Sequence, residues 1–246
     1  DVYKRQIDYG PFGWVEPLDP AWTPNEVDSS GRYGFGNQPR MAQWNLARLG
    51  SALTRLGVPV PDLESALRVF MDAYGDAFCE HMGRRLGLPK ERVDLDWLSQ
   101  LYQWMQQAQC DLNITLRGLA EVLRAPDPEL RLKALIRESS YGFPEQIEAA
   151  QVAASHWLRS WQERLGQQPY LQTAATMDAS NPVHIARNWM FGDVIASAEQ
   201  GDWTLFEKTL SRLRDPFLGS FEESLAGKRP TGAEMRIGCG RLTCSS

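Results

Sequence analysis

The chain has 246 residues, and because 43% of them are hydrophobic it can bury a substantial core in one large domain or two small ones. Its formal net charge of −5 argues against a nucleic-acid-binding surface over the whole molecule, so we expect no nucleic-acid partner. No apolar run reaches the roughly 18 residues that span a bilayer, and no apolar stretch follows Lys4 and Arg5 as in a secretory signal. We therefore expect a soluble intracellular protein with no membrane partner.

The first informative run is Ile-Asp-Tyr-Gly-Pro-Phe-Gly at residues 7–13, which places the carboxylate of Asp8 between an apolar residue and turn-forming residues. Ile7 can end a short buried strand, and a carboxylate at such a point can be aimed at a bound ligand. Mg²⁺ prefers oxygen ligands and takes one or two protein carboxylates, with phosphates and water in the other positions. Asp8 is therefore a candidate metal ligand, although an ordinary acid between a strand and a turn has the same pattern.

Residues 8–38 are crowded with Pro, Gly, Asp, Asn and Ser, so they cannot hold a long helix or strand. A loop of this length in a compact protein is usually functional or disordered. Its aromatic residues favour order, because they would be costly to leave in water. They are Phe12, Trp14, Trp22, Tyr33 and Phe35. We expect the loop to pack on a helical body and to present its polar groups to a cleft.

From Pro39 onward apolar residues recur at the helical spacing, which predicts a bundle of about seven helices. The helical segments are Trp44–Leu56, a helix capped by Asp62 that runs to Met82, Leu95–Met105, Asp111–Leu123, a short helix around Leu130–Ile136, Pro144–Leu165, a helix from Asn181-Pro182 to Gly201, and a last one from Asp202 to Asp215-Pro216. Four tryptophans at helical spacing are expected in the core: Trp44, Trp157, Trp161 and Trp189.

Four cysteines are too few for a disulfide scaffold in a chain of this length, which fits a reducing compartment. Cys79 and Cys110 fall in or at the end of apolar helical patterns and are expected to be packing residues. Cys239 and Cys244 lie in a Gly-rich tail, where a thiol is more accessible. The three histidines are far apart in the sequence, so no zinc cluster is expected.

An Asp-Tyr-Gly at a strand end, followed by a long loop and a helical body, resembles the C-terminal lobe of a protein-kinase-like fold. Further strings narrow the resemblance: Asp19-Pro20, Gly31-Arg32-Tyr33, Asn37-Gln38-Pro39, Trp44-Asn45-Leu46, Asn181-Pro182, Arg187-Asn188, Gly201-Asp202 and Cys244-Ser245-Ser246. Together with residues 7–13 they resemble the selenoprotein O family, kinase-like proteins that transfer AMP from ATP to hydroxyl side chains of other proteins. The implied fold class is mainly α, the helical C-terminal lobe of a protein-kinase-like fold with the N-terminal lobe absent.

By this resemblance Asp8 is the ATP-binding and metal-binding acid at the start of the activation segment, with Mg²⁺ or alternatively Mn²⁺ as the ion. For Arg32, an anchoring role within the loop is favoured over a contact with phosphate or substrate. The implied organisation is a divergent or non-native leader at 1–6, the metal-binding motif and activation-segment-like loop at 7–38, the helical lobe at 39–228, and a flexible C-terminal tail at 229–246.

By the resemblance, the catalytic Asp and the metal-binding Asn of the family lie about ten and nine residues before the position of Asp8, and its phosphate-binding groups lie further upstream. All of these positions therefore fall before residue 1. The resemblance therefore implies the C-terminal part of a Mg²⁺/ATP-dependent protein adenylyltransferase that modifies Ser, Thr or Tyr hydroxyls. No catalytic base is expected in this chain, which alone should be inactive. The intact protein is expected in the cytoplasm if bacterial and in mitochondria if eukaryotic.

The resemblance also bears on redox control. In part of the family a cysteine of the activation segment pairs with the cysteine of the C-terminal Cys-Ser-Ser, but Pro24 stands at the loop position here and cannot form that bond. Cys239 is then the nearest candidate partner for Cys244, and an unpaired tail is the alternative.

Two other interpretations stay open at this stage. A conventional protein kinase would transfer the γ-phosphate, and nothing in residues 1–246 decides which phosphate is attacked. A helical interaction module with no chemistry would also account for the apolar stripes.

Overall fold

The computed structural model describes residues 13–23, 28–219 and 227–233. Within these ranges the chain is mainly helical, and its β structure consists of two isolated bridges. The prediction of a mainly α fold is confirmed. The strand end expected at Ile7 lies outside the described residues. No described helix is long and apolar enough to cross a membrane.

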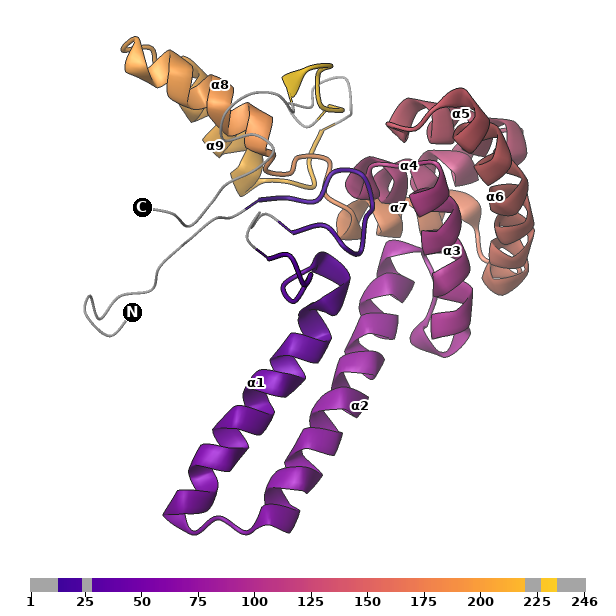
Figure 1. Ribbon diagram of the computed structural model, residues 1–246. Coiled ribbons are helices and arrows are strands. Elements are labelled where there is room, and N and C mark those ends of the chain that lie inside the picture. Colours follow the sequence, from indigo (N-terminus) through magenta and orange to yellow (C-terminus); the bar gives the residue numbers. More distant parts are fainter. Residues whose placement is uncertain (1–12, 24–27, 220–226, 234–246) are drawn as a thin grey trace.

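Nine α-helices lie in the described part of the chain and form three groups (Figure 1). The helices are α1 (Gln38–Leu53), α2 (Val60–Arg85), α3 (Leu95–Gln107), α4 (Leu112–Arg124), α5 (Pro128–Ser139), α6 (Pro144–Leu165), α7 (Tyr170–Ser180), α8 (Asn188–Glu199) and α9 (Thr204–Arg214). Helices α3 to α7 pack together, α1 and α2 form a long hairpin that extends away from them, and α8 and α9 form a second hairpin. The C-terminal end of α2 joins the first group, because it packs against α7.

A row of stacked tryptophans fills the centre of the α3–α7 group. The ring centroids of Trp97 and Trp157 lie 5.3 Å apart, as do those of Trp157 and Trp161, and Trp104 lies 6.0 Å from Trp157. All four side chains are at most 2% exposed. Trp161 donates its indole N–H to the carbonyl of Leu86 at 2.9 Å, which ties α6 to the end of α2. The core positions predicted for Trp157 and Trp161 are thus observed.

Acidic side chains start three helices of this group. The carboxylates of Asp94, Asp111 and Asp127 accept hydrogen bonds from backbone N–H groups in the first turns of α3, α4 and α5. Such caps satisfy donors that have no partner within the helix, and each typically contributes about 1 kcal/mol. Proline follows in the first turn of α5 and opens α6, where its missing N–H costs nothing. These local signals account for the accuracy of the predicted starts.

Helix α7 was not predicted, and the prediction of a helix start at Asn181-Pro182 is wrong. Asn181 instead ends α7: its amide donates to the carbonyls of Met177 and Arg85 at 3.0 and 2.8 Å, and its oxygen accepts from the Arg85 guanidinium at 2.7 Å. The next helix, α8, begins only at Asn188. Helix α7 is rich in Ala and Thr and packs against α4, so it lacks the strong apolar stripe that sequence periodicity detects.

The α1–α2 hairpin differs sharply from this core. Helix α1 contains no buried residue, and in α2 only Met82 and Gly83 are buried. Trp44 was predicted to be a core residue, but it is 42% exposed. Its ring makes cation–π contacts with two guanidinium groups, that of Arg32 at 4.2 Å and that of Arg48 at 5.3 Å, so the prediction of a core position is wrong. Trp189, on α8, is only half-buried.

Candidate functional site: the buried anchor of the loop after Asp8

The predicted site residues all lie outside the described residues. Asp8, the proposed metal ligand, precedes residue 13, and Cys239 and Cys244 follow residue 233. Pro24, the residue at the position of the family's loop cysteine, also falls in a range that is not described. The roles assigned to Asp8, Cys239 and Cys244 therefore stay predictions. What the structure describes is how the chain that follows Asp8 is held.

Residues 15–18 of this chain lie in a groove of the helical body. The backbone N–H of Leu18 donates to the carbonyl of Cys110 at 2.8 Å, and the N–H of Leu112 donates to the carbonyl of Glu16 at 2.9 Å. Pro17 lies between them opposite Asp111 in an isolated antiparallel bridge. Val15 and Leu18 are buried, as is the Glu16 side chain. The loop packs on the helical body here, as the sequence indicated.

An ion cluster lies beneath this bridge. The guanidinium of Arg187, which is fully buried, donates two hydrogen bonds to the Asp111 carboxylate, at 2.6 and 3.1 Å. The same guanidinium reaches Glu16 at 3.2 Å. A buried bidentate pair of this kind is strongly directional, because the flat guanidinium matches the geometry of the carboxylate. The three residues connect the loop, the start of α4 and the residue before α8.

Asp111 also caps helix α4. Its Oδ1 also accepts the backbone N–H groups of Asn113 and Ile114 at 3.1 and 3.0 Å, as the cap of α4. The carboxylate is completely buried, and burying a charge is costly unless its oxygens are fully bonded. The helix start and Arg187 together supply those bonds. The helix terminus thereby fixes the Arg187 side chain, and Arg187 in turn fixes Glu16.

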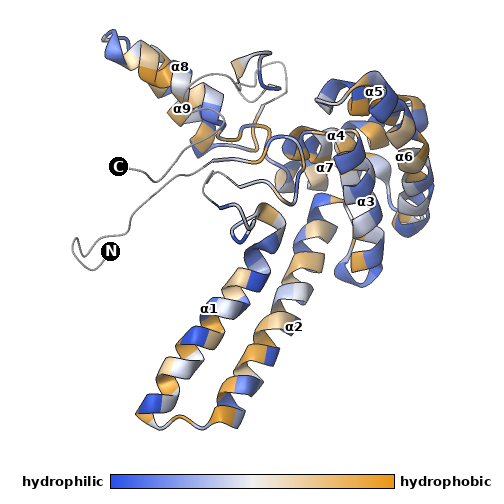
Figure 2. Cartoon of the chain, viewed as in Figure 1, coloured by the Kyte–Doolittle hydropathy of each residue, from blue (hydrophilic) through white to orange (hydrophobic). Residues whose placement is uncertain are grey.

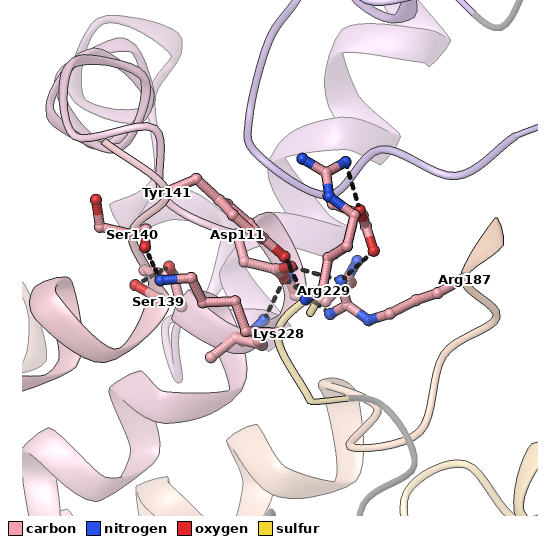
Figure 3. Close-up of polar contacts among 11 residues, drawn as sticks. Asp111, Ser139, Ser140, Tyr141, Arg187, Lys228 and Arg229 are labelled. Atoms are coloured by element: carbon pink, nitrogen blue, oxygen red, sulfur yellow. Dashed lines mark hydrogen bonds and ion pairs between the residues drawn. The ribbon is translucent and has the colours of Figure 1, made fainter. Parts of the chain in front are cut away.

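The C-terminal segment 227–233 completes the cluster (Figure 3). Arg229 donates from its guanidinium to Glu16 at 3.0 Å and from its backbone N–H to the hydroxyl of Tyr141 at 2.9 Å. The Tyr141 hydroxyl in turn points at Asp111, 3.4 Å away. Lys228 donates to the carbonyl of Ser140. We call Glu16, Asp111, Tyr141, Arg187 and Arg229 the anchor cluster.

Two members of the anchor cluster, Arg187 and Tyr141, keep their protons at neutral pH. Burial opposes the charged form of Arg187, but the hydrogen bonds and negative charge of Asp111 outweigh it, so the pKa of the guanidinium is raised. Burial and the nearby Asp111 carboxylate raise the pKa of the Tyr141 hydroxyl, which stays protonated. Because neither group changes charge near pH 7, the cluster suits a positioning role and not proton transfer.

The second described part of the loop, residues 28–37, is organised by its own side chains. Asp28 accepts the backbone N–H groups of Arg32 and Tyr33 at 2.9 and 2.7 Å, which lowers the pKa of its carboxyl. Asn37 donates to the carbonyl of Arg32 at 2.9 Å. Gly31 adopts φ +63°, a conformation that favours glycine. These contacts, with the stacking of Arg32 on Trp44, match the anchoring role that the sequence favoured for Arg32.

An apolar pocket of about 310 Å³ separates this loop from α2 and α3. It is lined by Leu18, Pro20, Phe35, Gly36, Gln38, Pro39, Tyr74, Phe78 and Tyr102. Tyr33 is 56% exposed and Phe35 36%, so the expectation that all loop aromatics pack on the body is wrong for these two. This pocket is mainly apolar, and the cleft that was expected to receive the polar groups of the loop stays a prediction.

No described residues form a metal centre of their own, because no group of three or more His, Cys, Asp and Glu side chains gathers among them. The chemistry of Asp8, a single carboxylate after an apolar residue, suits one ligand of Mg²⁺, an ion that takes few protein ligands beside phosphates and water.

Sequence reasoning missed the anchor cluster almost entirely. Asp111 was found as a helix start and Arg187 as part of a short motif, but Glu16, Tyr141 and Arg229 carried no local signal. Glu16 and Arg229 are 213 positions apart in the chain, so only the fold brings their charges together.

Comparison with known proteins agrees with the family resemblance found in the sequence. The profile of the family described as "Protein adenylyltransferase SelO" matches residues 2–214. "Protein nucleotidyltransferase YdiU" of Azoarcus sp. (strain BH72) is 38% identical over 98% of this chain, which covers 46% of that protein. The proteins of the same name from Xanthomonas campestris pv. campestris (strain B100) and Rhodopirellula baltica are 37% and 35% identical, with 46% and 47% of their lengths covered. The chain thus spans about half the length of the curated relatives that it matches.

Proposed function

This chain belongs to the SelO family, and we propose that the protein of which it is a part transfers AMP from ATP to Ser, Thr or Tyr hydroxyls of other proteins. The observation that carries the proposal is a family match that includes the run at 7–13 with Asp8. The buried anchor of the residues that follow Asp8 supports it, because a metal-binding carboxylate needs a fixed backbone.

In the proposed reaction the substrate hydroxyl oxygen attacks the α-phosphorus of ATP. The bond from that phosphorus to the oxygen that bridges it to the β-phosphate breaks, pyrophosphate leaves, and the hydroxyl proton passes to a base outside this chain. A bound Mg²⁺ supplies charge neutralisation on the phosphates. Asp8 is the residue of this chain that would hold the ion, and the rest of the chain positions Asp8.

We further propose that α1–α9 are the helical lobe of a kinase-like fold and that the other half of the protein packs on α1 and α2. The relatives are about twice as long as this chain, so a second half of similar size is available. Several apolar residues of the hairpin are exposed, including Leu49 at 55%, Val69 at 63% and Tyr74 at 38%. Figure 2 shows hydrophobic positions along both helices of the hairpin. Exposed apolar faces of this extent usually mark an interface.

Labelled ATP tests the reaction. The whole protein, incubated with protein substrate, should transfer label from α-labelled ATP and none from γ-labelled ATP. Transfer from the γ-phosphate instead would identify a conventional kinase, and no transfer from either would favour an interaction module.

Asp8→Ala tests the role of the carboxylate in the same assay. We expect label transfer to fall by about 10²-fold or more, because the charge that holds the ion is lost. Asp96→Ala removes an exposed carboxylate at the start of α3 and is the matched control, expected to be neutral. Equal transfer by both variants would refute the metal-binding role. The chain 1–246 alone should transfer nothing.

A further inference from the structure

We infer that the segment 227–233 is a non-covalent clamp on the loop after Asp8, and that Arg229 is the positioning residue through which the clamp acts. Insofar as the clamp sets the position of Asp8, it rests on the proposed function. Its effect on the structure of the loop can be measured without any assay of activity.

The charges of the anchor cluster balance only when Arg229 is in place. Glu16 and Asp111 supply two negative charges, and Arg187 and Arg229 supply two positive ones. The Asp111 carboxylate receives two hydrogen bonds from Arg187, at 2.6 and 3.1 Å, whereas Glu16 receives one from the same guanidinium, at 3.2 Å. Glu16 is 6% exposed with Arg229 in place, and without Arg229 it would share the one remaining arginine of the cluster with Asp111. Burying an incompletely paired carboxylate is costly, so Glu16 is the member of the cluster that depends on the clamp.

The segment is docked by more than one ion pair. Both Lys228 and Arg229 lie over the Tyr141 ring, at 5.0 and 5.2 Å from its centroid, and the Arg229 backbone N–H donates to the Tyr141 hydroxyl. Ala233, at the other end of the described segment, is 1% exposed. The expected boundary at residue 229 between lobe and tail therefore falls inside a docked stretch of chain.

Glu16 transmits the position of the clamp to the loop. Its carboxylate is held by Arg229 and Arg187, and its own carbonyl accepts the backbone N–H of Leu112. Glu16 is eight positions after Asp8 in the chain, with Gly10 and Gly13 between them. Gly13 is closely packed, because an added Cβ there would lie 2.9 Å from the Trp22 ring. A backbone fixed from Gly13 to Leu18 limits where the segment that precedes it can lie.

Amide hydrogen exchange of the whole protein tests the clamp directly. In Arg229→Gln we expect the amides of Leu18 and Leu112, which bond across the loop bridge, to exchange about tenfold faster, and amides of α6 to be unchanged. Arg229→Lys keeps the charge and should restore most of the protection. Arg214→Gln removes an exposed arginine at the end of α9 and serves as the matched control.

A double-mutant cycle identifies Glu16 as the partner. Arg229→Gln should accelerate exchange of the Leu18 amide when Glu16 is present and add little in the Glu16→Gln background, since the shared contact is already lost. Additive effects would overturn the pairing. Uniform acceleration throughout α6 would also overturn the clamp, because it would mean a general loss of stability.

Enzyme kinetics test whether the clamp affects the proposed reaction. If AMP transfer occurs, Arg229→Gln should lower kcat by about tenfold and leave the KM for ATP within about twofold, because a misplaced metal-binding residue affects the reaction more than nucleotide binding. If kcat is unchanged while hydrogen exchange changes as expected, the clamp exists but Arg229 has no role in the reaction. If no AMP transfer is found in the unaltered protein, the exchange data still decide whether the clamp exists.

Discussion

The α3–α7 group and the α1–α2 hairpin are both built from amphipathic helices, yet they bury very different amounts of their apolar surface. In the first group four tryptophans stack out of contact with water, while in the second a tryptophan contacts two arginines at the surface. The comparison shows that apolar periodicity specifies a helix and its apolar face, but not whether that face has a partner within this chain. The core can account for its own stability, and the hairpin cannot.

Asp111→Ala should produce the largest loss of stability, since it removes the partner of buried Arg187 and the cap of α4 together. Breaking a buried ion pair from one side costs about 3–5 kcal/mol, and a lost cap adds about 1 kcal/mol. Urea unfolding of the chain measures the change. Asp127→Ala, which removes the cap of α5 without an ion pair, is the control and should cost about 1 kcal/mol. A similar loss in both variants would show that the ion pair contributes nothing.

Trp157→Ala tests the core side of the comparison. The side chain touches three other tryptophans and is 1% exposed, so its removal should cost about 3–5 kcal/mol of unfolding free energy. The same urea titration reports it. A cost below about 1 kcal/mol would mean that the stack is not the centre of the core.

Alkaline pH should weaken the core through Cys110. Burial raises the pKa of this thiol to about 11. Below about pH 9 the thiol is protonated in the folded and the unfolded chain, so its contribution to stability is fully present. Between about pH 9 and 11 only the unfolded chain releases the proton, and stability falls by about 2–3 kcal/mol.

Urea midpoints measured from pH 8 to 11 follow this decline. Cys110→Ala should flatten it, although the raised pKa of Tyr141 still contributes to the loss above pH 10. Cys79→Ala is the control for removal of a thiol elsewhere. An identical decline in Cys110→Ala would exclude the thiol as its source.

Trp44→Ala should have the smallest effect on the unfolding free energy of the chain. It tests most directly whether the exposed face of the hairpin has a partner in the whole protein. In the chain 1–246 we expect a loss below about 1 kcal/mol, because the ring is exposed and its cation–π contacts are weak in water. In the whole protein the loss should be larger, since the other half is proposed to cover this face. Equal losses in the two forms would contradict that packing.

The starts of α3, α4, α5 and α6 were the most predictable feature of the fold, whereas the cap expected at Asp62 is wrong, because α2 begins at Val60 and has no side-chain cap. Asp94, Asp111 and Asp127 act through neighbours within three positions, and Pro144 acts on its own backbone, so the sequence alone reveals them. Helix α7 was missed because it lacks a strong apolar stripe. The role of Asn181 was missed because its partner Arg85 is 96 positions away. The anchor cluster was missed for the same reason.

The sequence by itself determined the helical character of the chain, the caps of its core helices and its family, because each of these depends on residues close together or on the order of short motifs. The tertiary structure decided which tryptophans are buried, where the loop after Asp8 is anchored, and that Arg229 completes a charge cluster with Glu16 and Arg187. Salt screens charges at the surface beyond about 10 Å, and apolar contacts act only between touching atoms, so residues far apart in the chain acquire these roles only when folding brings them together.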